Sequence, residues 1–112
     1  VKHDQTMAMV SHLPHLLAYG LMELFYHPRV TMQPLFFSAG SLRDFTRVAE
    51  SSPELWSQIF QLNKTAVIET IDLYQETLER MKKAILASEK GNGDDLLKIL
   101  GRAKEVRKRI TG

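Results

Sequence analysis

Two histidines that stand three residues apart, His12 and His15, are the side chains of this sequence best suited to chemistry. On a helix they share one face of residues 3–26 with Asp4 and small alanines, as would suit a helix that lines a polar cavity. An imidazole can donate or accept a hydrogen bond and titrates near neutral pH, so two could form the polar end of a ligand pocket. Helix carbonyls or Ser11 could equally satisfy both rings in a structural role. The spacing alone leaves both interpretations open.

A metal site at these histidines is disfavoured by distances along the helix. A bound ion needs a third and usually a fourth ligand nearby. Asp4 lies roughly 10 Å up the helix, at a rise of about 1.5 Å per residue, and only a distant residue such as His27 or Glu23 could complete the shell. We therefore expect no metal.

Two further side chains, Arg47 and Trp56, are ambiguous when taken alone. The planar guanidinium of Arg47 could clamp a carboxylate through two parallel hydrogen bonds, although the spacing favours a surface pair with Glu50 or Asp44. A single tryptophan on an apolar stripe is most often part of the core. The sequence has no nucleophile beside a base, no glycine-rich phosphate loop and no GxGxxG. No catalytic residue is therefore predicted within these residues.

The histidines are predicted to lie on one long helix over residues 3–26, with Pro14 near its middle. Proline has no N–H for the carbonyl four residues earlier, so we expect a kink there. The residue before a proline avoids helical backbone, so the helix should end at His27 and Pro28. The core face is predicted opposite the histidines, and consists of Thr6, Val10, Leu13, Leu17, Leu21 and Leu24.

Shorter helices are predicted next along the chain, the first of them a brief one over residues 35–37. Ser41 and Asp44 form a capping-box pattern at the start of the second. Ser52 and Pro53 provide an N-cap and a first-turn proline for the third. The side chains predicted to face inward from the last two are Leu42, Phe45, Val48, Ala49, Trp56, Ile59 and Phe60.

The remaining residues predict two long helices in an antiparallel hairpin. Over residues 63–88 apolar side chains recur at alternating spacings of four and three, a heptad seam that indicates pairing with another helix. This helix either continues from the one over 53–62 or restarts at Asn63. Gly91, Asn92 and Gly93 supply the turn and Asp94 a cap, and residues 96–110 carry an apolar side. No segment alternates polar and apolar residues over strand length, so the fold class is all-α.

The composition is that of one globular domain, residues 1–112, with 44% hydrophobic and 25% charged residues. The net charge of +2 arises mostly near the C-terminus, where carboxylates are interspersed and aromatic residues are lacking, so no nucleic-acid partner is expected. No apolar run reaches the ~18 residues that span a membrane. The absence of cysteine fits a cytoplasmic location. The chain begins at Val1 in a helical pattern, as a piece of a longer protein would.

Several short blocks succeed one another at specific separations: His3 with Asp4, residues 11–15 (SHLPH), 40–47 (GSLRDFTR), 52–56 (SPELW) and Asn63. In order and spacing they resemble the C-terminal domain of the prephenate dehydrogenase family. The blocks span about residues 3–63, and the helices to residue 110 fit the family's helical tail. The opening HDQTMA also resembles the cyclohexadienyl and bifunctional chorismate mutase branches, whereas the SHLPH block favours the stand-alone type.

The resemblance implies an all-α domain of the 6-phosphogluconate-dehydrogenase-like type, with long antiparallel helices in an intertwined homodimer. It implies an N-terminal Rossmann domain for NAD or NADP, and oxidative decarboxylation of prephenate to 4-hydroxyphenylpyruvate in tyrosine biosynthesis. Tyrosine is a candidate inhibitor. The histidine that polarises the substrate hydroxyl would lie in the N-terminal domain, so we expect the isolated chain to be inactive. The alternative is a non-catalytic helical dimerisation module.

Site residues are carried over by position from the same resemblance. Ser41 departs from the glycine that is common at its place. The substrate-binding residues would be His12, His15, Gly40, Arg47 and Trp56. A polar network around them would comprise Asp4, Ser11 and Asp44, the last of which would reach across the dimer.

Overall fold

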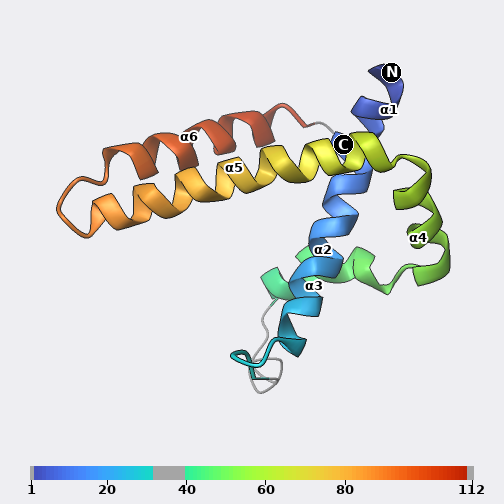
Figure 1. The fold of residues 1–112 in the computed structure, drawn as a ribbon. Helices are drawn as coiled ribbons and strands as arrows, with labels where there is room; N and C mark the ends of the chain where they lie inside the picture. The colour runs from blue at the N-terminus through green and yellow to red at the C-terminus, as the bar shows by residue number, and fades with distance from the viewer. Residues whose placement is uncertain (1, 32–39, 111–112) are drawn as a thin grey trace. The chain divides into compact units, whose positions relative to one another are not determined.

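The computed structural model describes residues 2–31 and 40–110, and every regular element in these two ranges is helical (Figure 1). The prediction of an all-α fold is therefore confirmed. The chain divides into two compact units, Val1–Ile71 and Asp72–Gly112. Within the described ranges, no helix combines the length and the apolar character needed to cross a membrane.

The N-terminal helical segment changes its hydrogen-bond pattern close to Pro14. It consists of α1 (Lys2–Met7), the π-helix η1 (Ala8–His12), α2 (Leu13–Glu23) and the 3₁₀ turn η2 (Leu24–Tyr26). The N–H of Leu13 donates to the carbonyl of Ala8, five residues earlier. The irregularity observed before Pro14 is a widened turn, and the kink at Pro14 itself stays a prediction. The segment ends at the predicted place, because His27 before Pro28 has extended backbone.

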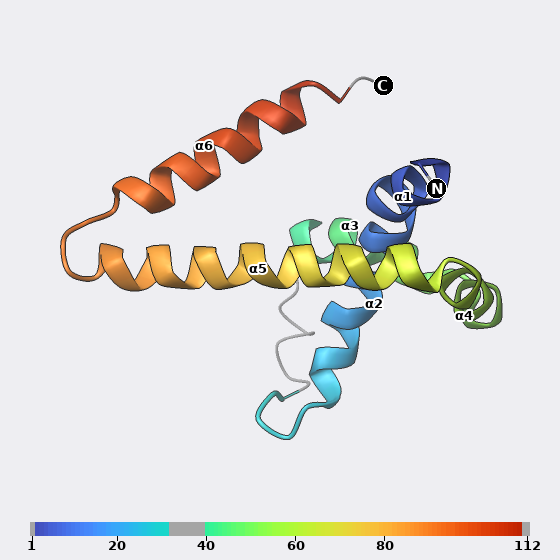
Figure 2. The same cartoon turned by 45° about the horizontal axis from the view of Figure 1, so that its top comes forward.

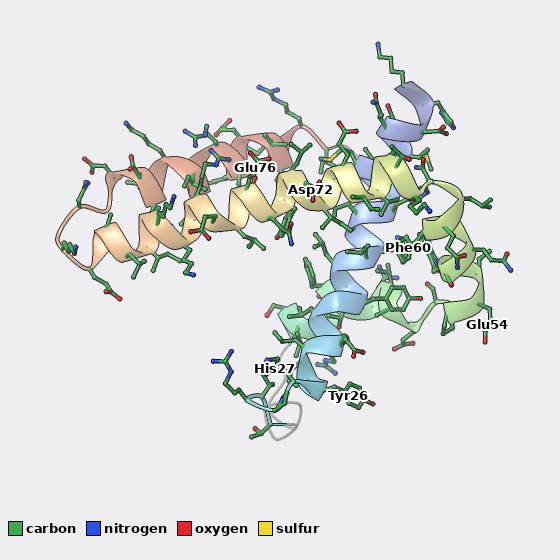
Figure 3. The ribbon with its side chains drawn as sticks, in the orientation of Figure 1. Tyr26, His27, Glu54, Phe60, Asp72 and Glu76 are labelled. Carbon is green, nitrogen blue, oxygen red and sulfur yellow. The ribbon has the colours of Figure 1, made fainter. Side chains whose placement is uncertain are left out.

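The core of the N-terminal unit is built on small residues. Ala8 is fully buried against Ala66 and Val67 of α5 (Lys64–Ser88), and Leu16, Phe60 and Ile71 pack around this cluster. Phe60 projects from α4 (Pro53–Leu62) toward α2 in Figure 3, whereas Glu54 of the same helix points outward. The short alanine side chain lets the two helix backbones approach closely, which is why the core forms here.

The predicted core face of the first segment is wrong in part. Leu13 is buried as expected, but Val10 is 67% exposed and Leu24 is 49% exposed. The buried alanines, Ala8 and Ala18, lie on the opposite side, which was predicted to line a polar cavity. That side therefore supplies helix packing as well as the histidines.

The next segment comprises α3 (Gly40–Thr46) and the 3₁₀ turn η4 (Arg47–Glu50). Its predicted capping box is wrong, because the helix already includes Gly40, which places Ser41 inside the first turn. Phe45 was predicted to face inward and is 56% exposed. Tyr19 of α2 donates from its hydroxyl to the carbonyl of Ser51 at 2.8 Å, which fixes the end of this segment. The brief helix predicted over residues 35–37 lies outside the described residues.

Two of the sequence predictions concern the start of α4 and the junction between α4 and α5. Ser52 is the N-cap, since its hydroxyl oxygen accepts from the N–H of Leu55 at 3.2 Å, and Pro53 occupies the first turn. The helix stops at Leu62 because Asn63 adopts non-helical backbone, with φ −114° and ψ 34°. The helices over 53–62 and 64–88 are therefore separate.

The C-terminal unit is a helical hairpin, in which α6 (Asp94–Lys108) runs back in the opposite direction to the later part of α5 (Figures 1 and 2). The predicted turn is confirmed, although Gly93 rather than Asp94 is the N-cap of α6. The predicted seam is incompletely covered within one chain. Its exposed members include Leu78 and Ile85 on α5, and those on the apolar side of α6 are Leu97, Leu100, Val106 and Ile110.

The hairpin turn depends on Gly91, whose φ of +89° is unfavourable for a residue with a side chain. Gly91→Ala is expected to lower the free energy of unfolding by about 1 kcal/mol. Gly101→Ala is the opposite control, because this glycine lies inside α6 and an added Cβ would meet no atom within 4 Å. It should stabilise the helix by about 0.5–1 kcal/mol. Urea unfolding of both variants measures the two changes. Equal changes in the free energy of unfolding would contradict the special role of Gly91 in the turn.

Candidate functional site

Three of the predicted site residues form one aromatic cluster in the N-terminal unit. The ring of His15 stacks on Trp56, with centroids 3.7 Å apart and planes 14° from parallel. His12 meets the same indole edge-on, at 6.1 Å and 79°. Phe60 contacts Trp56 in a tilted arrangement, with ring centroids 5.6 Å apart. The π-helix and the start of α2 provide the histidines, and α4 provides the aromatic rings.

Hydrogen bonds orient both imidazoles. The Nδ1 atom of His15 lies 2.9 Å from the carbonyl oxygen of Ser11, one turn earlier. The Nδ1 atom of His12 lies 3.2 Å from Nδ2 of Asn63, whose amide also donates to the carbonyl of Asp4 at 2.9 Å. Both residues are only partly buried, so their side chains are not sealed in the core. The structural and ligand-binding interpretations of the histidines are therefore compatible.

A surface pocket of about 300 Å³ opens beside this cluster. Polar groups contribute one part of its wall and apolar side chains from α1 and α4 the rest, as expected for a site that holds a small organic molecule. Its lining residues are His3, Asp4, Met7, His12, Ile59, Leu62 and Asn63.

The other predicted site residues lie on a different segment. Gly40 and Asp44 are exposed on α3, and Arg47 is exposed on η4. No hydrogen bond or ion pair connects Arg47 to the histidines, nor to Glu50 or Asp44, in the ranges 2–31 and 40–110. The surface interpretation of Arg47 requires an ion pair with Glu50 or Asp44. The described carboxylates do not form that pair.

Asn63 is the contact residue that sequence reasoning did not place in the site. The sequence marked it only as a helix restart and as one block of the resemblance. Its side chain instead connects the junction between α4 and α5 to Asp4 of α1 and to His12 of the π-helix. These two residues lie 59 and 51 positions earlier in the sequence. A polar residue at a junction between two helices was the available signal.

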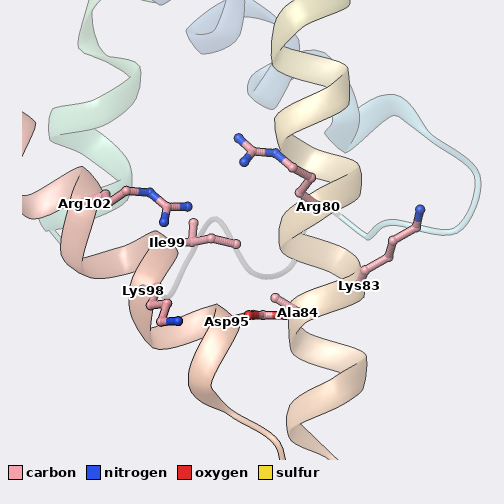
Figure 4. Close-up of a pocket in the computed structure, with 7 residues that line it drawn as sticks. All are labelled: Arg80, Lys83, Ala84, Asp95, Lys98, Ile99 and Arg102. Carbon is pink, nitrogen blue, oxygen red and sulfur yellow. The ribbon is translucent and has the colours of Figure 1, made fainter.

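A second pocket lies in the C-terminal hairpin, between α5 and α6 (Figure 4). It measures about 320 Å³ and has Ala84 and Ile99 as apolar lining. Asp95 is the single carboxylate among its lining residues, and the cations around it are Arg80, Lys83, Lys98 and Arg102.

Asp95 is expected to relieve repulsion among these four cations. Asp95→Asn should therefore destabilise the hairpin by about 0.5 kcal/mol more than Asp94→Asn in dilute buffer. Asp94 is the matched control, since both carboxylates lie in the first turn of α6 and only Asp95 lines the pocket. At about 0.5 M salt the difference should vanish through screening. Thermal unfolding at two salt concentrations measures it, and a difference that persists at high salt would contradict the electrostatic cause.

No group of three or more histidine and carboxylate side chains is placed to hold a metal ion in the described part of the chain.

Comparison with known families identifies what the chain is similar to. A family model described as "Prephenate dehydrogenase, dimerization domain" matches residues 1–102. Cyclohexadienyl dehydrogenase of Zymomonas mobilis is 36% identical over 107 residues, which cover 94% of this chain and 36% of that protein. Prephenate dehydrogenase of Bacillus subtilis is 30% identical over 108 residues, covering 95% of this chain and 28% of that protein. The chain therefore spans about a third of the length of these curated relatives.

Two solved structures are similar in fold. Prephenate dehydrogenase from A. aeolicus, crystallised with hydroxyphenyl propionate and NAD+, superposes with a TM-score of 0.82 at 32% identity. The match covers 97% of this chain and 37% of that one. Arogenate dehydrogenase of Synechocystis has a TM-score of 0.84 at 22% identity, over 96% of this chain and 39% of that one, and supports the fold alone.

Proposed function

The chain belongs to the family of prephenate dehydrogenase dimerization domains, and from this premise we propose that it is the helical part of a longer NAD- or NADP-dependent dehydrogenase. The proposed reaction is the oxidative decarboxylation of prephenate to 4-hydroxyphenylpyruvate, in the biosynthesis of tyrosine in the cytoplasm. Cofactor binding is assigned to an N-terminal domain. The described residues contain no strand followed by a glycine-rich turn, which is the motif that binds the pyrophosphate of a dinucleotide.

The contribution of these residues is to bind and orient the substrate. Prephenate presents two carboxylates and one hydroxyl, which a site must hold at fixed positions before the ring can become aromatic. We assign Arg47 to a substrate carboxylate, His12 to the pocket wall, and His15 and Trp56 to substrate contacts beside the pocket. Gly40 would approach the ligand with its backbone, and the surrounding polar network would comprise Asp4, Ser11 and Asp44.

The observation that carries this assignment is the stack of His15 on Trp56, beside His12. Residues 41 positions apart in the sequence meet there, next to a pocket that also contains Asp4 and Asn63. A histidine pair buried in a core would have no open pocket beside it, and both residues would be fully buried. The arrangement therefore favours a binding site over a non-catalytic module.

We also propose that the chain forms a homodimer. Large apolar side chains remain exposed along both helices of the hairpin, and burial of such surface is the main driving force of subunit association. Among them are Leu78, Ile85, Leu97, Leu100 and Val106. A second copy that covers them would account for the heptad spacing on α5.

Arg47→Ala in the full-length enzyme tests the site. Loss of a charged hydrogen bond to a carboxylate should weaken binding of 4-hydroxyphenylpyruvate about tenfold, with no change in the dimer. Arg43→Ala is the matched control, because this exposed arginine lies one turn earlier, on α3. Calorimetry and sedimentation measure the two properties. Equal affinities for both variants and the wild type would favour the non-catalytic module.

A further inference from the structure

The side-chain amide of Asn63 has only one orientation that satisfies its neighbours. Its Nδ2 atom lies 2.9 Å from the backbone carbonyl of Asp4, which can accept a hydrogen bond but cannot donate one. The group that faces this carbonyl must therefore be the NH₂, since the amide oxygen would be repelled there. The same NH₂ lies 3.2 Å from Nδ1 of His12. Its two hydrogens can serve the two acceptors at once.

This orientation dictates which nitrogen of His12 carries the proton. Because Nδ1 accepts from Asn63, a neutral His12 must carry its hydrogen on Nε2. His15 is fixed in the opposite way. Its Nδ1 faces the carbonyl of Ser11 at 2.9 Å and must donate to it, so a neutral His15 has a free lone pair on Nε2. Two rings three residues apart are thus held in opposite tautomers.

We propose that Asn63 is a positioning residue that holds His12 as the Nε2–H tautomer. His12 then offers a hydrogen-bond donor to a carboxylate or carbonyl oxygen of the ligand without first taking up a proton. His15 offers an acceptor to a different ligand atom that donates, such as a hydroxyl. The assignment of a ligand rests on the proposed function, whereas the tautomer assignment rests on the hydrogen bonds alone.

The role of Asn63 is separable from a purely structural tie between helices. A tie to Asp4 alone would need one hydrogen and would leave the imidazole free to adopt either tautomer. The second hydrogen removes that freedom, and the edge-on contact with Trp56 limits rotation of the ring. The measurable difference is therefore the protonation pattern of His12, which helix packing by itself does not set.

Nitrogen NMR of the full-length protein with labelled histidine tests the tautomers directly. Signals are assigned with His12→Gln and His15→Gln. The wild type is expected to show the Nε2–H pattern for His12 and the Nδ1–H pattern for His15, at a pH where both rings are neutral. The Nδ1–H pattern for His12 in the wild type would overturn the proposal, whether or not any variant folds.

Asn63→Asp tests the cause of the tautomer. The new carboxylate accepts instead of donating, so His12 should convert to the Nδ1–H form or to the imidazolium. Asn92→Asp is the matched control, because this exposed asparagine in the hairpin turn undergoes the same chemical change away from the site. An unchanged His12 signal in Asn63→Asp would overturn the proposal.

Binding of hydroxyphenyl propionate, measured by calorimetry on full-length variants, tests the consequence. For this test Asn63→Ala replaces Asn63→Asp, because it removes both amide hydrogens without adding a charge beside the carboxylate of the probe. Asn63→Ala and His12→Gln should each weaken binding about tenfold, and the double variant should be no weaker than the single ones. Additive losses would contradict an action through His12. If the wild type showed the expected tautomers and did not bind this probe at all, the proposed function would fail while the positioning of His12 by Asn63 stood.

Discussion

Trp56→Ala is expected to lower the free energy of unfolding by about 3 kcal/mol. Truncation of a large buried aromatic costs about 3–5 kcal/mol, and a half-buried side chain belongs at the lower end. The loss includes the stack with His15 and the contacts with His12 and Phe60, since aromatic pairs contribute about 0.5–1.5 kcal/mol each beyond their buried area. Urea unfolding at one fixed protein concentration measures the change, because the proposed dimer would make stability depend on concentration.

The preceding residue provides the control for this prediction. Leu55→Ala removes a side chain that is 53% exposed on the same turn of α4. It should cost less than about 1 kcal/mol. If both variants were destabilised equally, Trp56 would matter only through the helix it belongs to, and its role as the platform for the histidines would be lost.

Val67→Ala is expected to lower the free energy of unfolding by about 2–3 kcal/mol. Val67 is 3% exposed and packs against fully buried Ala8. Removal of two methyl carbons loses about 0.8 kcal/mol of transfer free energy for each, and the cavity left behind adds to this loss. The backbones of η1 and α5 are already close, so they have little room to collapse into the space. Denaturant unfolding, again at a fixed concentration, tests the value.

The neighbouring Ile68→Ala separates core packing from helix propensity. Ile68 lies one residue further along α5 and is 51% exposed. Its replacement by alanine, the better helix former, should change the free energy of unfolding by less than about 1 kcal/mol. A loss at Ile68 as large as that at Val67 would mean that this exposed face is itself covered, most simply by a second copy of the chain.

Local chemistry was the part of the fold that could be predicted from the sequence. Ser52 and Pro53 begin a helix because a hydroxyl cap and a fixed φ act within a few residues. The first helical segment ends at His27 because the following proline, Pro28, disfavours helical backbone at the residue before it. The Gly91 turn likewise needs only one permissive residue. At Asp94 the cap was misplaced by one residue, because Gly93 is the N-cap of α6, and at Ser41 it was wrong because α3 already includes Gly40.

The core face of the first segment failed for a longer-range reason. A constant rotation of 100° per residue assigned Val10 to the same side as Leu13, but the π-helix lies between the start of the segment and Leu13 and changes that rotation. Val10 is consequently exposed and Ala8 buried. Periodicity also could not reveal that alanines on the histidine side meet α5, because that contact depends on a partner helix far along the chain.

The grouping of some candidate site residues could be predicted. His12, His15 and Trp56 do meet, whereas Asp4 and Ser11 take part through their backbone carbonyls, which lie within hydrogen-bond distance of Asn63 and of His15 respectively. The binding roles of all five stay predictions. Asn63 was missed as a contact residue because its role arises only when α4 ends and its side chain reaches α1. The roles assigned to Arg47, Gly40 and Asp44 stay predictions.

The widened turn at Ala8–His12 also bears on how the length of this chain can vary. A π turn contains one more residue than an α-helical turn. The helices before and after it therefore keep the same rotation relative to each other. Loss of Met9, whose side chain is 53% exposed, is therefore expected to yield a regular α-helix with both flanks still aligned. The same deletion inside α2 would turn every later side chain by about 100°. Natural shortening of this segment should concentrate in that single turn.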